Sequence, residues 1–346
     1  MSRKNTFLEK ENTDCIKGIC AIAILIAHLY SRTGIGSTIG LGPILTSFGY
    51  LGVSVFFALS GYGLAYSYEN KKGIIRFREN NILNTKGNGE GYLSNFLRNR
   101  VLSTYFLQAF CVLLYGLSHL LFLGPVSLKA FVQSFFLFDT VVTNGWYLQT
   151  IIVFYLIFYC SYQWLHRYQY VGVGLGLMFF VLICVAYGVS KTWYECSFCF
   201  LLGFILYYMR FELQGVINKN TLFITTYLVV SFLFIAMFVL GNGQYIKPLM
   251  VRVPIKMMSS VLFAFLVLFV SNRVSVKNRL TKWLSYYYLE IYLFQGIVFM
   301  ALRNRFWNLS NPYIFLIIAL ILTLLVAHMI KPLTSRILAI VKCKLV

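Results

Sequence analysis

The stretch DCIKGICAIAILIAHLY, Asp14–Tyr30, decides the class of fold, because an apolar run of this length is typical of a membrane-spanning helix. It keeps a lysine, Lys17, near one end and a histidine, His28, near the other. Ionisable side chains inside a membrane span are expensive to bury, and they often mark a substrate path or a reactive site. The stretch therefore predicts a membrane protein with a polar feature inside it.

The composition of the whole chain is that of a polytopic membrane protein. Of its 346 residues, 59% are hydrophobic and only 12% are charged, and the mean hydropathy is +0.75. The apolar runs are long and uninterrupted, which favours helices over a β-barrel. We predict an all-α membrane bundle of about ten transmembrane helices, each of roughly 20 residues. The expected spans are 16–31, 48–68, 101–123, 144–164, 170–188, 193–209, 222–240, 256–271, 284–302 and 313–330.

The basic residues predict the orientation of the bundle. If the N-terminus is cytoplasmic, 22 of the 30 Lys and Arg residues fall on the inner side, as the positive-inside rule requires. Both termini are then cytoplasmic. The net charge of +20 needs no nucleic acid, because a basic cytoplasmic loop, 69–100, and a basic cytoplasmic tail, 331–346, would face anionic lipid headgroups or an anionic ligand. Without a fixed-period repeat, the chain is interpreted as one transmembrane domain, 1–346.

Lys17 and His28 are expected on one stripe of their helix. They are eleven residues apart, and eleven steps of about 100° return to within roughly 20° of the starting direction. Their separation along the helix axis is about 16 Å, which puts Lys17 at the cytoplasmic mouth and His28 in the outer half of the membrane. Asp14 falls close to the same stripe. This pattern predicts a path between two compartments.

His28 is the candidate catalytic residue. A histidine inside a span is costly unless it faces a polar cavity, and its ordinary pKa of about 6.5 suits it to take a proton from an attacking hydroxyl. A histidine that only bonds a neighbouring helix is an equal alternative from His28 alone. No metal is expected, because the lone C-x-x-C at Cys196 and Cys199 lies inside a span and is interpreted as packing.

Other polar residues can be interpreted either as structural or as functional. Ser60 fits helix packing better than catalysis, since small residues are common at helix contacts in membranes. Trp146 and Tyr147 begin a span at the outer boundary, where an aromatic belt and a wall for an acceptor sugar are equal alternatives.

Glu290 lies inside a span, where an ionised carboxylate needs a partner. A basic residue at the inner mouth, such as Lys17 or Arg100, is the expected partner, and a substrate-positioning role is the alternative. Arg98 and Arg100 stand where an inner loop enters a span, so they are placed to reach a ligand.

Four motifs occur in an order that resembles a known family. The first span has D-x-x-K-G with His28 after ten intervening residues, and it resembles the opening motif of the integral-membrane acyltransferase-3 family, in which Arg is usual at Lys17. LGVSVFFALSGYGL (Leu51–Leu64) resembles the family's second-helix signature. NGWYLQTIIVFYL (Asn144–Leu156) resembles its Trp-x-Leu motif, and SYYYLEIYLFQG (Ser285–Gly296) its late Ser-x-x-x-Tyr-Leu segment. The resemblance covers nearly the whole chain.

The resemblance implies a membrane O-acyltransferase. Family members move an acyl group, commonly acetyl, from cytoplasmic acyl-coenzyme A to hydroxyls of cell-envelope glycans or related acceptors. By this resemblance His28 meets the acceptor hydroxyl, while Lys17, Arg98 and Arg100 meet the phosphates of the donor. The implied location is the inner membrane of a bacterium.

Four residues depart from the family pattern. Lys17 replaces the usual Arg, Gln295 stands where many members have His, and Ser103 stands at the second position of an expected Arg-x-x-Arg. A further family feature, a Pro, is replaced by Phe106. These changes affect donor binding more than the chemistry at His28.

Two other classes of function stay open from the residues alone. A transporter or flippase of a glycan or small solute also needs polar groups along a membrane path. ATP-driven transport is not expected, because the sequence has no G-x-x-x-x-G-K-[ST]. A catalytically silent partner of an envelope assembly complex is the third class. The acceptor, the acyl chain length and the oligomeric state are left open by the sequence.

Overall fold

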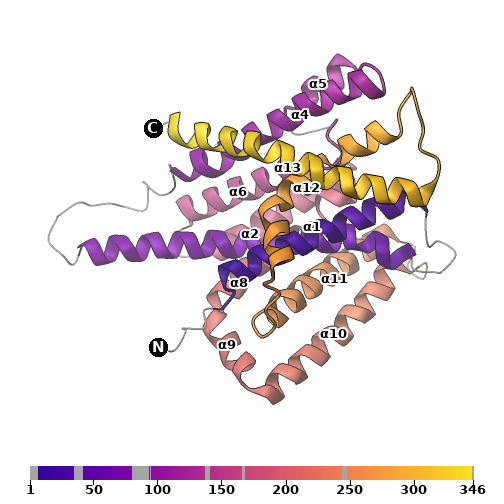
Figure 1. Cartoon of the computed structure of the whole chain (residues 1–346). Coiled ribbons are helices and arrows are strands. Elements are labelled where there is room, and N and C mark those ends of the chain that lie inside the picture. Colours follow the sequence, from indigo (N-terminus) through magenta and orange to yellow (C-terminus); the bar gives the residue numbers. More distant parts are fainter. Residues whose placement is uncertain are drawn as a thin grey trace. The chain divides into compact units, whose positions relative to one another are not determined.

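The described part of the chain is all-α. The computed structural model describes residues 7–34, 42–79, 93, 95–136, 141–165, 168–243 and 248–344. Over these ranges there is no strand, only an isolated bridge between Arg303 and Asn308. The elements are α1 (Lys10–Thr33), α2 (Gly42–Glu79), η2 (Leu97–Leu102), α4 (Ser103–Phe122), α5 (Leu128–Gln133), α6 (Trp146–Trp164), α7 (Gln169–Ala186), η3 (Lys191–Trp193), α8 (Ser197–Tyr208), α9 (Arg210–Asn218), α10 (Asn220–Asn242), α11 (Leu249–Val270), α12 (Arg279–Leu302) and α13 (Pro312–Lys344) (Figure 1).

Seven of the described helices are long and apolar enough to cross a membrane, or eight if the bent pair Lys191–Tyr208 and Arg210–Asn218 counts as one span. All ten expected spans overlap helices. However, α6 and α12 are not among the seven. These two helices carry polar side chains such as Gln149 and Glu290, which lower their mean hydropathy. The number of ten spans therefore stays a prediction.

The residue contacts divide the chain into two compact units, each made of three stretches of sequence. Unit 1 comprises Met1–Lys17, Tyr50–Phe96 and Ile157–Lys282. Unit 2 comprises Gly18–Gly49, Leu97–Leu156 and Trp283–Val346. Each unit is described separately, and the single domain over 1–346 stays a prediction.

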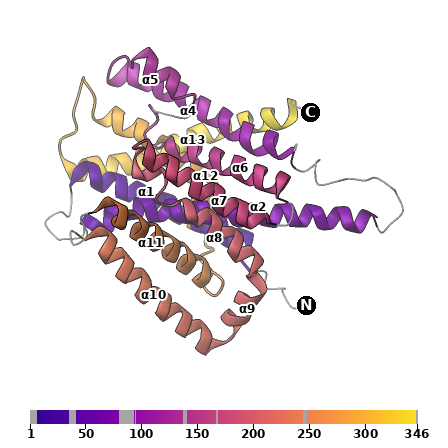
Figure 2. The ribbon, with the colours of Figure 1, turned by 180° about the vertical axis from the view of Figure 1, so that it is seen from behind.

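In unit 1, α8 contacts α7 and α11, and α11 lies beside α10 (Figures 1 and 2). The most apolar part of α10 has none of its residues buried. A helix that is hydrophobic all round yet covered by little protein is suited to face lipid. This unit therefore has a lipid-facing helix at its edge.

The α2 and α8 helices of unit 1 approach at two glycines. A Cβ at Gly61 would collide with the Phe200 carbonyl oxygen, and a Cβ at Gly203 would collide with the Ala58 carbonyl oxygen. Small residues let membrane helices come this close. Ser60, beside Gly61, donates its hydroxyl to the Phe56 carbonyl of its own helix at 2.8 Å.

In unit 2, α4 packs beside α13. Aromatic side chains fill its interior, and Tyr115, Tyr292, Phe294 and Phe299 are each at most 1% exposed.

Two helices extend beyond the spans expected from the sequence. In unit 2, α13 continues to Lys344, through the region expected as a basic tail. In unit 1, α2 likewise runs to Glu79, into the expected loop 69–100, of which residues 80–92 and 94 lie outside the described residues.

Candidate active site

His28 lies on the part of α1 that belongs to unit 2, where α1 meets α12 at two levels. At the first level a Cβ on Gly18 would come within 2.7 Å of the Ser285 backbone nitrogen, so the two backbones almost touch. At the second level His28 meets Gln295, ten residues further along both helices. Both pairs are separated by 267 residues in the sequence, so α1 and α12 run in the same direction over this length.

The hydrogen bonds of Gln295 define the state of the His28 ring. Its amide nitrogen donates to the Tyr292 carbonyl at 2.8 Å, so its amide oxygen is the atom that faces His28 Nδ1, at 3.1 Å. An amide oxygen only accepts, and therefore Nδ1 of the neutral ring carries the proton. The lone pair is then on Nε2, which has no hydrogen bond within the described residues. His28 as a residue is partly buried, and Nε2 is the ring nitrogen left for a substrate.

Residues from α4 and from the start of α6 hold the α12 backbone around Gln295. Asn144 donates to the same Tyr292 carbonyl at 3.0 Å, and the Tyr115 hydroxyl donates to the Leu293 carbonyl at 2.8 Å. The ring of Tyr147 lies edge-on to that of Tyr292, with centroids 5.2 Å apart. These contacts fix the carbonyl that orients Gln295.

The polar residues that support Gln295 are themselves buried. Gln295 is 0% exposed and Asn144 is 2% exposed. Buried amides are costly unless they are hydrogen-bonded, and both of them are. The arrangement is thus a rigid support for one imidazole, with the opposite ring nitrogen left for chemistry.

Comparison with known proteins decides the family. The profile of a family described as an acyltransferase domain matches residues 11–330, which is nearly the whole chain. The chain belongs to this family. It is therefore a membrane acyltransferase with several apolar helices, and the resemblance seen in its motifs is confirmed. No curated protein and no solved structure matches it.

Glu290 has a basic partner, as expected, but that partner is neither Lys17 nor Arg100. The partner comes from α13: Lys331 Nζ lies 3.0 Å from Glu290 Oε2, and the Thr334 hydroxyl donates to Oε1 at 2.6 Å. Glu290 is 2% exposed, so both carboxylate oxygens are satisfied inside the protein. α12 and α13 are consecutive helices, but the sequence does not say which basic side chain of α13 lies at the level of Glu290.

The residues expected to hold the donor lie in different units of the acyltransferase. Lys17 and Asp14 belong to unit 1, where their side chains form an ion pair of 2.8 Å. Arg98 and Arg100 belong to unit 2, in the short π-helix η2. Arg98 is half-buried and Arg100 is exposed. A donor site made of these residues, and a continuous path from Lys17 to His28, stay predictions.

The remaining expected residues have local roles. Ser103, at the place of a family arginine, is buried and donates its hydroxyl to the Asn99 carbonyl at 2.5 Å. It closes the end of the π-helix instead of offering a charge. Trp146 is half-buried at the start of α6. Ser60 lies in unit 1 and bonds its own helix, as described above.

Three supporting residues of unit 2 were not identified as site residues from the sequence: Tyr115, Asn144 and Gln295. Gln295 was noted only as a departure from the family, and Asn144 only as part of a motif. The signal that could have found them is a large polar side chain inside an apolar run. Such a side chain needs a partner, but the sequence does not say which.

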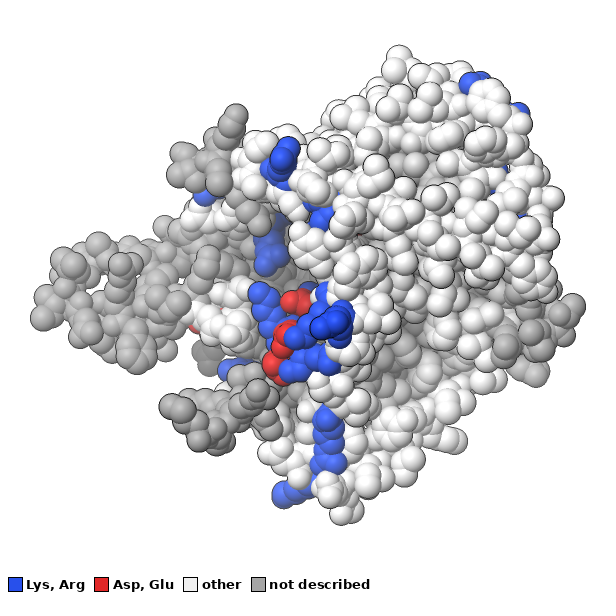
Figure 3. Space-filling model, viewed as in Figure 1, with Lys and Arg blue, Asp and Glu red and all other residues white. Residues whose placement is uncertain are grey.

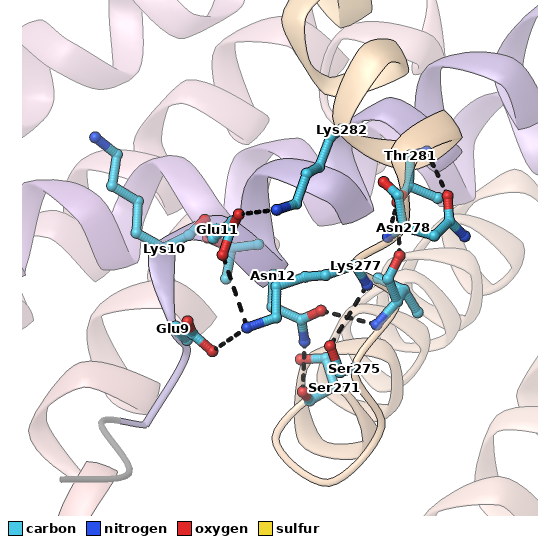
Figure 4. Close-up of polar contacts among 12 residues, drawn as sticks. Glu9, Lys10, Glu11, Asn12, Ser271, Ser275, Lys277, Asn278, Thr281 and Lys282 are labelled. Carbon is cyan, nitrogen blue, oxygen red and sulfur yellow. Dashed lines mark hydrogen bonds and ion pairs between the residues drawn. The ribbon is translucent and has the colours of Figure 1, made fainter. Parts of the chain in front are cut away.

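Charged side chains gather over the N-terminal end of α1, whereas most of the visible surface is uncharged (Figure 3). In unit 1, Lys277 lies 2.7 Å from Glu9 and Lys282 lies 2.5 Å from Glu11. Asn12 donates to the Ser271 carbonyl at 2.7 Å and accepts from the backbone N–H of residue 276 at 3.0 Å (Figure 4). These contacts tie the start of α1 to the connection between α11 and α12. We call this set of contacts the α1 latch.

Proposed function

We propose that this acyltransferase is an O-acetyltransferase, moving an acetyl group from cytoplasmic acetyl-coenzyme A to a hydroxyl of an extracytoplasmic or lipid-linked glycan. The observation that carries the proposal is the fixed tautomer of His28. With Nδ1–H directed at Gln295, Nε2 is a base within a membrane protein whose family transfers acyl groups. A neutral imidazole with its lone pair on Nε2 suits proton abstraction from an alcohol.

The reaction can be balanced with His28 as the single base. The acceptor hydroxyl oxygen attacks the thioester carbonyl carbon while His28 Nε2 takes the hydroxyl proton. The carbon–sulfur bond then breaks, and the coenzyme A thiolate leaves and is protonated by the imidazolium. An acyl-imidazole formed by attack of Nε2 itself, then transferred to the hydroxyl, has the same overall balance. In both routes Gln295 accepts a stronger hydrogen bond from Nδ1 once the ring is cationic.

The donor is proposed to approach from the cytoplasm. Its phosphates would meet Lys17, Arg98 and Arg100, where arginine offers a two-pronged contact and lysine a single charge. The thioester at the end of the slender pantetheine arm would then reach toward His28. This direction requires cytoplasmic termini and a bacterial inner membrane, which we propose together with the donor.

The proposal can be tested by mass spectrometry of envelope glycans. Cells that carry His28→Ala at normal membrane abundance should lose the acetyl esters that wild-type protein adds. His119→Ala is the matched control, because His119 lies at the last turn of α4 and is outside the proposed machinery. Unchanged esters in the His28→Ala cells would remove the proposal. Solute movement across vesicles without acyl-coenzyme A binding would favour a transporter instead.

A further inference from the structure

The end of unit 2 beyond His28 carries arginines with no acidic partner. Arg32 lies one turn after His28 on α1, and Arg303 and Arg305 follow the end of α12. Among the described residues, none of the three forms an ion pair with Asp or Glu. The neighbouring stretches 31–47 and 303–312 contain no Asp or Glu at all.

Arg32 and Arg303 are held next to each other. An Nη atom of Arg303 donates to the Arg32 backbone carbonyl at 2.8 Å, and the two side-chain charges repel. Each guanidinium lies over an aromatic ring: Arg32 over Phe299 at 5.0 Å and Arg303 over Phe315 at 4.2 Å. Nε of Arg303 also donates to the Leu309 carbonyl at 3.3 Å. Stacking uses the flat face of a guanidinium, so the remaining N–H groups at its edge can meet an anion.

Two positioned cations that repel each other form a site for a negative charge. The repulsion is relieved when an anion bonds both guanidinium groups, and such charge-assisted bonds are the strong ones. The protein supplies no carboxylate for this purpose within the described residues. A ligand is therefore the group that would complete the pair.

Arg32 is also close to the reactive imidazole. Four residues of helix bring it about 6 Å beyond His28 along the axis, on the same face. The charge of Arg32 acts on the His28 ring. An anion bound at Arg32 would thus lie one helical turn from the atom that takes the hydroxyl proton.

We propose that Arg32 and Arg303 bind a carboxylate or phosphate on the acceptor, next to the hydroxyl that His28 deprotonates. This proposal rests on the proposed function and names its substrate class: an anionic glycan, not a neutral one. Carboxylate and phosphate share the oxygen geometry that an arginine fork recognises.

The test measures binding of defined saccharides to the full chain in phosphatidylcholine nanodiscs, without acyl donor. Methyl glucuronide and methyl glucoside 6-phosphate are compared with neutral methyl glucoside by saturation-transfer NMR titration. We expect at least one anionic sugar to bind about tenfold more tightly than the neutral one, which corresponds to about 1.4 kcal/mol. Which anion gains more distinguishes a carboxylate from a phosphate ligand.

Variants test whether Arg32 and Arg303 cause the tighter binding of the anionic sugar. Arg32→Gln and Arg303→Gln should each remove most of the tenfold difference, while binding of neutral methyl glucoside is unchanged. Arg305→Gln is the matched control at the same end, because Arg305 donates to the Leu120 carbonyl and, among the described residues, has no hydrogen bond to Arg32. It should keep the preference.

Three outcomes would overturn the inference. The first is equal or undetectable binding of the charged and neutral sugars. The second is a preference that survives Arg32→Gln and Arg303→Gln. The third is a preference that disappears when phosphatidylglycerol is added to the discs, since the arginines would then belong to lipid headgroups. Because no donor is present, these outcomes are separate from failure of acyl transfer, which the His28→Ala cells report.

Discussion

The amide oxygen of Gln295 lies 3.1 Å from Nδ1 of His28, across 267 residues of sequence. The bond orients an imidazole that lies one helical turn before Arg32. In the described part of the chain the second ring nitrogen has no hydrogen bond, and Arg32 has no acidic partner. Groups that orient a reactive histidine are often worth as much as a direct contact with substrate. The account of this acyltransferase depends on that pair.

Gln295→Leu should lower kcat by about 10- to 100-fold, because Nδ1–H loses its acceptor and the ring its orientation. KM for the acyl donor should change little, since the donor is not expected to touch Gln295. Steady-state transfer from radiolabelled acetyl-coenzyme A measures both constants. Gln295→Glu is the partial control: its carboxylate can still accept from Nδ1–H but cannot donate to the Tyr292 carbonyl, so it should lose less activity than Gln295→Leu. Equal loss in both variants would argue against an orienting role.

Glu290→Ala should destabilise unit 2 by about 3–5 kcal/mol, because it leaves the Lys331 ammonium without its buried carboxylate. Thermal unfolding in detergent measures the effect. The double variant Glu290→Met with Lys331→Met should be much less destabilised than Glu290→Ala, since no charge is left unpaired. If the single variant unfolds at the wild-type temperature, the ion pair is not structural.

Gly61→Ala should prevent normal accumulation of the protein, because the new methyl group would collide with the Phe200 carbonyl where α2 meets α8. Gly63→Ala provides the control on the same helix: a Cβ there meets nothing within 4 Å. That change should be neutral or stabilising by up to about 1 kcal/mol, from helix propensity. Membrane abundance and thermal unfolding of the two variants would be compared, and similar behaviour would contradict the close approach of the helices.

Asn12→Ala should destabilise the α1 latch by about 1–3 kcal/mol, because Asn12 is buried and satisfies three backbone groups. The thermal unfolding temperature should fall by a similar amount at neutral and at alkaline pH, since no titrating group is lost. A wild-type unfolding temperature would show that the latch contributes nothing.

Lys282→Gln tests the charged part of the α1 latch. The hydrogen bond and charge of Glu11 raise the pKa of Lys282 above its ordinary value of 10.5. A raised pKa means that the stabilisation is fully present below 10.5 and is lost as the pH rises through the raised value. The small difference in unfolding temperature between Lys282→Gln and wild type should therefore disappear at strongly alkaline pH, and also in high salt. If the difference in unfolding temperature does not change with pH or with salt, the contribution of Lys282 is not electrostatic.

The fold class could be predicted because apolar runs of spanning length are a property of the local sequence. Each expected span overlaps a helix, and the stripe that holds His28 is local too. The partners of polar residues could not be predicted in this way. Glu290 meets Lys331 from the next helix, and His28 meets Gln295 from α12, but a hydropathy pattern does not say which side chains meet across two packed helices.

Composition also explains where the sequence and the structure differ in detail. α6 and α12 are expected as ordinary spans, yet α6 carries the buried amide of Gln149, and α12 carries the buried Glu290 and Gln295. Polar residues inside a span often have a function, and they also lower the mean hydropathy of their helix. Boundaries such as the extension of α13 to Lys344 differ because a helix can continue past the apolar run into a polar region.

The most direct test of the account is acetyl transfer by purified protein in nanodiscs, with His28→Gln compared with wild type. Glutamine keeps a polar side chain but cannot take a proton, and general base catalysis contributes about 10²- to 10⁴-fold. We predict that His28→Gln loses transfer by at least about 100-fold while it still folds and binds acetyl-coenzyme A. Transfer within about threefold of wild type, far below the general-base contribution, would contradict the assignment of His28 as the base.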